Sequence, residues 1–189
     1  MNAPMQAEAN GHTHGLCQDV LVTVATAHQV VRGVLQTRGD RLLDILNRSQ
    51  SSFLRIERAE VLEDLNGDCI GTELSHAIVR KSEICLAIPN EVAGRPLEKI
   101  LCAYSAKQSH KAFIAALGYL IEGQIHLRRC SDEVAVLTRE LGEFLPVTSA
   151  KVTCVQEASH PCDCPITIVN ASAISLFSLV PIRRQEQNR

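Results

Sequence analysis

The amino-acid sequence predicts an all-β protein built from two tandem small barrels, each with five antiparallel strands. The first observation is an internal similarity in which residues 29–61 match residues 119–152, at an offset of 90 or 91 positions. A match of this length indicates a duplicated module. The second observation is that short apolar segments, separated by turn signals, fill most of each copy. The third is the pair Gly33 and Gly123, because a glycine within a strand favours the sharp bend that closes a short sheet into a barrel.

The two repeats are expected at residues 19–89 and 110–181. In the first repeat, segments rich in β-branched and apolar residues predict five strands, at residues 19–27, 30–36, 53–62, 72–79 and 84–88. Two stretches that contain glycine and aspartate, Arg38–Asp40 and Asn66–Asp68, predict turns between them. The second repeat is expected to follow the same five-strand scheme.

Helical segments are expected in two kinds of place. One or two helical turns should cap each barrel, because apolar residues recur there at helical spacing, namely Leu42, Ile45 and Leu46, and then Val134, Leu137 and Leu141. The linker at residues 90–109 contains Gly94 and Pro96, which interrupt the strand pattern, and a short helix is expected at residues 97–106. Residues 1–18 and 182–189 carry no apolar pattern and are expected to form loose tails.

Composition and charge argue against several classes of protein. The formal net charge is −2, so the chain as a whole has no attraction for nucleic acid or an anionic membrane. No apolar run approaches the roughly 18 residues that a membrane-spanning helix needs, and residues 1–15 lack the apolar core of a signal peptide. We therefore expect a cytoplasmic protein that does not bind membranes, with its eight cysteines present as reduced thiols. The compactness of the chain favours a bacterial protein.

No arrangement of residues predicts catalysis. The sequence has no glycine-rich phosphate loop, no dinucleotide-binding fingerprint and no pair of carboxylates typical of acid–base catalysis. His28 and His126 have no serine, cysteine or aspartate partner in a nucleophile context. We therefore predict a non-enzymatic protein, and no cofactor is expected other than zinc.

One short stretch carries residue types that bind metals. His160, Cys162 and Cys164 follow one another closely, and Cys154 is the nearest additional thiol. Imidazole and thiolate groups together are ligands of zinc. Structural zinc sites usually take cysteine pairs with two to four residues between them, whereas Cys162 and Cys164 are closer together and no second pair is present. The alternatives are therefore a zinc site and a polar loop with incidental thiols.

Arginines gather in the first repeat and would suit contacts to phosphate groups. They are Arg32, Arg38, Arg41, Arg48, Arg55 and Arg58. Acidic residues such as Glu57 and Glu60 lie among them, so a network of surface ion pairs is the alternative. Aromatic residues that would stack on bases are few, and the matched pair Phe53 and Phe144 is expected in the core.

The core of each repeat resembles the Sm-like barrel family. The family's first motif has a bent strand with a central glycine, an Asp-to-Asn turn, and a strand with an acidic-Ala-acidic-Val ending. The corresponding residues here are Arg32–Leu35, Asp44–Asn47 and Glu57–Val61. The second motif joins an Ile-Arg-Gly strand end to a following strand, and it corresponds to Ile78–Ile84 and Ile168–Ile174. A generic SH3-like barrel would produce much the same pattern.

The resemblance implies a ligand and a mode of assembly. In the family the Asn and the Arg-Gly pair line a pocket for an RNA base, which carries over to Asn47 and Arg80 of the first repeat. The second repeat has Thr138 at the position of Asn47, and Lys81 or Ala171 replaces the family's second-motif glycine. Sm-like modules also pair edge strands to form rings of six or seven, so three two-module chains would form a six-module ring.

The sequence thus predicts a binding or assembly module that acts through self-association or through a protein partner. The duplication is the observation on which this prediction depends, because each copy is too small to bury a large core alone. Two alternatives remain. One is RNA binding through Asn47, Arg80 and Arg41, and the other is metal binding through His160, Cys162, Cys164 and Cys154.

Overall fold

The structure, a computed structural model, describes residues 19–67, 69–91, 108–127, 134, 142–155 and 160–179, and it is nearly all β in these ranges. The strands are β1 (Asp19–Ala25), β2 (Val30–Gln36), β3 (Phe53–Leu62), β4 (Cys69–Arg80), β5 (Leu86–Glu91), β6 (Gln108–Ala116), β7 (Tyr119–Leu127), β8 (Phe144–Cys154), β9 (Cys162–Asn170) and β10 (Ile174–Leu179). A six-residue helix, α1 (Leu42–Asn47), lies between β2 and β3. Short 3₁₀ turns at Lys81–Glu83 and Ala171–Ala173 lead into β5 and β10.

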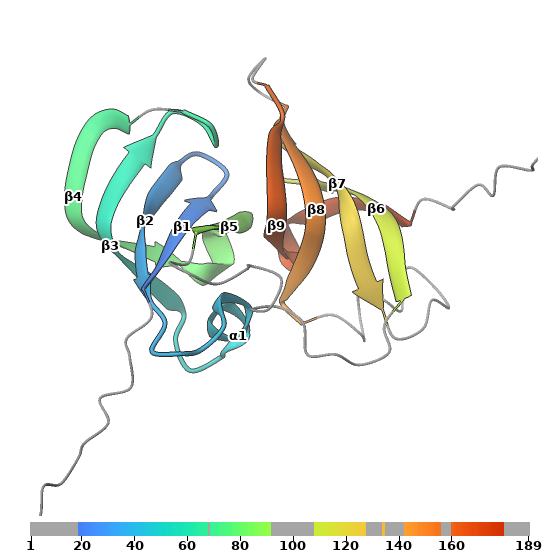
Figure 1. Cartoon of the computed structure of the whole chain (residues 1–189), viewed down its shortest axis with the longest axis horizontal. Coiled ribbons are helices and arrows are strands. Elements are labelled where there is room, and N and C mark those ends of the chain that lie inside the picture. Colours follow the sequence, from blue (N-terminus) through green and yellow to red (C-terminus); the bar gives the residue numbers. More distant parts are fainter. Residues whose placement is uncertain are drawn as a thin grey trace, which may run out of the picture.

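The ten described strands form one antiparallel sheet in the order β10-β6-β7-β8-β9-β5-β1-β2-β3-β4 (Figure 1). We call β1–β5 the first half and β6–β10 the second half. β5 pairs with β1 of its own half on one side and with β9 of the second half on the other. The prediction of an all-β protein is therefore confirmed. The two separate closed barrels are not confirmed, because the described strands continue from one half into the other and the sheet does not close.

The two halves pair their strands in the same way. Gly33 lies opposite Val22 in the first half, and Gly123 lies opposite Ala112 in the second. The same offset of 90 or 91 residues relates the partners of β3 and β4 to those of β8 and β9. Each position of one half therefore has a counterpart in the other half, and the two surroundings can be compared directly.

The strands bend sharply where the sequence places its two glycines. A Cβ atom on Gly33 would lie 2.6 Å from Cγ2 of Ile56 and 2.7 Å from the main-chain oxygen of Glu57, so only glycine fits there. The strand opposite contributes to the bend as well, since Arg58 has a φ of 49° and its counterpart Ser149 has a φ of 47°. The predicted bend is therefore present in both halves, and each takes the form of a bulge in the strand pairing.

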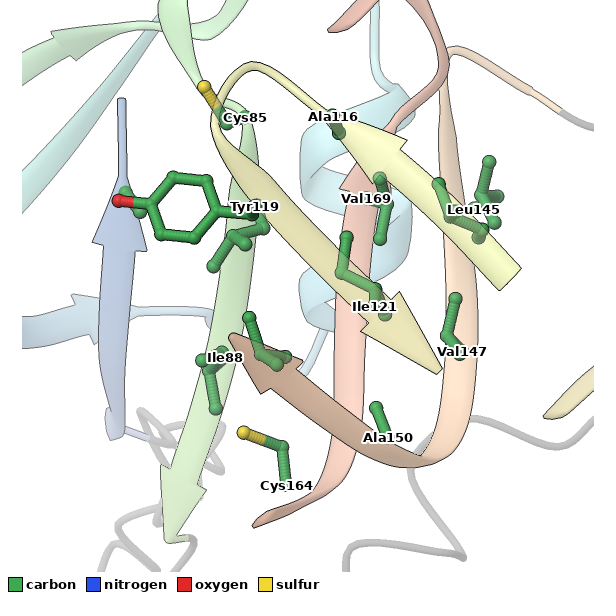
Figure 2. Packing of buried hydrophobic residues seen from close by; sticks show 14 of the residues in the cluster. Cys85, Ile88, Ala116, Tyr119, Ile121, Leu145, Val147, Ala150, Cys164 and Val169 are labelled. Atoms are coloured by element: carbon green, nitrogen blue, oxygen red, sulfur yellow. The ribbon is translucent and has the colours of Figure 1, made fainter. Parts of the chain in front are cut away.

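The apolar core forms two clusters, and each contains residues from both halves. Cys85, which precedes β5, and Ile88 of β5 belong to the cluster that fills the second half, together with Leu145 and Val169 (Figure 2). In return, Phe144 of β8 belongs, with Ile168 of β9, to the cluster inside the first half. The two halves thus share their cores, which fits the prediction that a copy of this size needs a neighbour.

Several predicted elements fall outside the described residues. These are the linker helix at residues 97–106, both tails, and the helical turn of the second repeat except for Val134, which is helical. The predicted helical turn of the first repeat is confirmed as α1, where Leu42 and Leu46 are buried. No helix in the described ranges is long and apolar enough to cross a membrane.

Candidate functional site

The junction between the two halves is a short stretch of sheet that is closed by a buried amide. Leu86 pairs with Val169, and Ala87 pairs with Ile168. Beyond these pairs, the main-chain N–H of Asn170 donates to the oxygen of Cys85 over 2.9 Å. The side-chain amide of Asn170 also donates to the main-chain oxygen of Ile84 over 2.9 Å. Strand pairing and a side chain therefore fix the register of the two halves together.

A second contact fixes the junction on the side of α1. Asn47, at the end of α1, donates its amide N–H to the oxygen of Phe144 over 3.0 Å. Its amide oxygen accepts from the N–H of Phe144 over 2.8 Å. The ring of Phe144 is 3 % exposed and packs in the same cluster as Leu42 and Leu46. Asn47, which the sequence placed in an RNA pocket, thus uses both polar ends of its side chain within the protein.

The two edges of the sheet expose the counterparts of the residues that are buried at this junction. Phe53, Leu74 and Ile78, which we call the apolar strip, are 48 %, 39 % and 60 % exposed. Their counterparts Phe144, Cys164 and Ile168 are 3 %, 4 % and 0 % exposed. At the other edge Leu176 is 50 % exposed, whereas its counterpart Leu86 is fully buried. β4 lies on the side of the first half that faces away from the second half (Figure 1).

A polar pocket of about 630 Å³ lies where the two halves meet, and three cationic side chains from the first half line it. Arg48 forms an ion pair with Asp40 over 2.8 Å. The guanidinium of Arg80 lies 5.1 Å from the ring centroid of Phe53. Lys81 is buried, and its ammonium donates to the main-chain oxygens of Ile45 and Arg48 over 2.6 and 2.9 Å.

The pocket combines positive charge with hydroxyl groups from both halves. Burial lowers the pKa of Lys81, whereas the carboxylate of Glu143 acts in the opposite direction. The hydroxyl-bearing residues of the lining come from both halves, and they are Ser49, Ser51, Ser52, Ser82 and Ser172. Cations and hydroxyls together are suited to an anionic ligand such as a phosphate group.

The residues that were grouped for RNA binding make different contacts in the structure. Arg80 lines the pocket, and Asn47 contacts Phe144 instead. Arg41 is the residue that precedes α1, is partly exposed, and is not part of the pocket lining. Three other arginines form ion pairs with acidic residues, as the alternative interpretation expected, namely Arg32 with Glu60, Arg48 with Asp40 and Arg55 with Glu57.

The metal-binding hypothesis concerns the start of β9. The sulfurs of Cys162 and Cys164 lie 3.4 Å apart. Burial, together with the hydrogen bond between the two thiols, raises the pKa of Cys164 to about 12, so this thiol is protonated at neutral pH. His160 is exposed, and its main-chain oxygen accepts from the amide of Asn66 over 2.9 Å. Within the described ranges, no three histidine, cysteine or acidic side chains are placed to hold a metal ion, and this includes Cys154.

Comparison of the chain with family models, with characterised proteins and with solved structures found no match.

The sequence interpretation did not identify the exposed apolar residues of β4 and β10. Two of these residues have the same type as their buried counterparts, since Ile78 and Ile168 are both isoleucine and Leu176 and Leu86 are both leucine. The available signal was the end of β4, where Leu74 and Ile78 lie on one face of the strand and Ala77 and Val79 on the other. A strand that is apolar on both faces predicts burial on both faces, and this required a neighbour that the first half does not supply.

Proposed function

We propose that the protein is a non-enzymatic assembly module whose copies join head to tail, with β4 of one copy beside β10 of the next. The observation that supports this proposal is the pairing of β5 with β9 within one chain. β9 is the counterpart of β4, and β10 is the counterpart of β5. Each end of the chain's sheet is therefore a copy of one side of an interface that the same chain already forms.

The register of the proposed interface follows from the internal junction. Replacing each junction residue by its counterpart places Val79 opposite Leu176 and Ile78 opposite Phe177. Arg80 would then take the place of Asn170 and donate to the main-chain oxygen of Ile174. The exposed apolar strip and the exposed Leu176 would be covered, which removes two unpaired sheet edges from solvent.

A head-to-tail interface of this kind is heterologous, so it produces a closed ring or an open filament. The resemblance to Sm-like barrels favours a ring, and three chains with two modules each would give six modules. A closed ring leaves no free edge, whereas a filament leaves one at each end. On this proposal the two halves are copies of one small barrel module, and the linear sheet of one chain is a third of the complete assembly.

Light scattering combined with size-exclusion chromatography tests the assembly. We expect a mass that is a multiple of 20.7 kDa for the native chain, and the mass of one chain for Ile78→Lys, because a lysine there would bury an unpaired charge. Val155→Lys is the matched control, since Val155 is equally exposed at 60 % but lies outside both edges, and it should leave the mass unchanged. A native chain that is strictly monomeric at micromolar concentrations contradicts the proposal.

A second candidate function is the binding of single-stranded RNA in the junction pocket. The observation that favours it is the set of Arg48, Arg80 and Lys81 beside hydroxyl groups. The resemblance to Sm-like barrels supports RNA as the source of the phosphate groups. Arg80 both lines the pocket and matches an RNA-binding position of the family.

Binding of a short single-stranded RNA should weaken as salt concentration rises, because phosphate contacts release bound counterions. Arg80→Ala is expected to weaken this binding about tenfold, the equivalent of about 1.4 kcal/mol. Arg55→Ala is the control, since Arg55 is ion-paired with Glu57 outside the pocket and its removal should change the affinity little. Equal affinities of the native chain and Arg80→Ala would rule out this pocket as the RNA site.

A further inference from the structure

One titratable side chain, His76, lies beside the apolar strip. It follows Leu74 and precedes Ile78 on the same face of β4, and it is exposed. Its counterpart in the second half is Ile166, which is 1 % exposed beside the internal junction. Strand positions that correspond in this way should be buried alike once the β4 edge is covered. Association would therefore move the imidazole of His76 from water into an apolar interface.

The charged groups around His76 are few. Glu57 lies directly opposite on β3, but its carboxylate is bonded to Arg55 over 2.6 Å. The hydroxyl of Ser75 lies 3.2 Å from Nδ1 of His76. On the other side of the proposed interface, the sequence of β10, Ile-Ser-Leu-Phe-Ser-Leu, contains no charged residue. β6, which neighbours β10, contributes only Lys111 and His110 near this end, and neither is acidic.

We propose that protons control the assembly through His76, an inference that rests on the proposed function. A neutral imidazole enters an apolar interface at a modest cost, whereas an imidazolium loses its hydration there. The carboxylate opposite it, Glu57, already balances the charge of Arg55, so an imidazolium would leave one net positive charge in this cluster. Histidine changes charge near pH ~6.5, which lies within the range that cells and their compartments span. Neutral solution therefore favours the assembled form and mildly acidic solution favours the dissociated form.

The test measures the dissociation constant of the assembly by sedimentation at about pH 7.5 and about pH 5.5. For the native chain we expect the dissociation constant to rise about tenfold or more on acidification. His76→Ile, which installs the residue of the counterpart position, should associate at least as tightly and respond much less to pH. His28→Gln, an exposed turn histidine outside both edges, should behave like the native chain.

The outcomes separate the two proposals. Assembly that is equally tight at both pH values, or a pH response that persists in His76→Ile, overturns proton control and leaves head-to-tail assembly intact. A native chain that does not associate at either pH contradicts the assembly itself and, with it, its control by His76.

Discussion

Gly33→Ala is expected to lower the free energy of unfolding by about 3 kcal/mol. The added methyl group would lie 2.7 Å from the main-chain oxygen of Glu57, and a backbone atom cannot move aside as the end of a long side chain can. Relief would require opening the β2–β3 bulge, and with it the bend that lets the first half enclose its core. Urea denaturation followed by circular dichroism measures this loss.

Gly39→Ala is the control for this substitution. No atom lies within 4 Å of a Cβ at Gly39, so the only cost is the positive φ of 91°. That cost is about 1 kcal/mol. If both variants lose the same stability, close backbone approach is not the reason for glycine at position 33.

Phe144→Ala is expected to cost about 3–5 kcal/mol of unfolding free energy, as is usual for a buried phenylalanine. The ring of Phe144 crosses from the second half into the core of the first half, so its loss leaves a cavity beside Leu42 and Leu46. Phe53→Ala provides the matched comparison, because Phe53 is the counterpart of Phe144 and is 48 % exposed. In a single chain it should cost only about 1 kcal/mol.

Both phenylalanine variants should be measured in the Ile78→Lys background, so that association does not contribute to stability. Differential scanning calorimetry or urea titration then compares them directly. Equal losses for the two substitutions would mean that Phe144 does not hold the halves together. In the native background, where chains can associate, Phe53→Ala should weaken assembly as well. In the proposed assembly the ring of Phe53 packs into the second half of a neighbouring copy, as the ring of Phe144 packs into the first half of its own chain.

Local structure was predictable from the sequence. The expected strands at 30–36 and 53–62 coincide with β2 and β3, and the helical spacing of Leu42 and Leu46 identified α1. These elements follow from residues near one another in the chain, where alternation and turn residues act directly. Gly33 was interpreted correctly for the same reason, since a glycine within a strand restricts the local backbone.

The arrangement of the two halves was not predictable in this way. Pairing of β5 with β9 is decided between residues about 80 positions apart, and the sequence of β5 is equally compatible with a return to its own β4. Asn47 shows the same difficulty, because its partner Phe144 lies 97 residues away. A short polar residue at the end of a helix predicts that its side chain forms hydrogen bonds. The residue type does not show whether the partner is a ligand or the protein's own backbone.

The long separation between β5 and β9 has a consequence for synthesis on the ribosome. Translation proceeds at about 5–20 residues per second, so β9 follows β5 after several seconds. During this interval the first half has two open edges instead of one, and Cys85, Leu86 and Ile88 lack the apolar partners that the second half later provides. At this stage the unpaired β5 edge of one nascent chain can pair with the β5 edge of another chain on the same polysome. Protection by a chaperone that binds extended apolar strands would be needed most while residues 92–161 emerge.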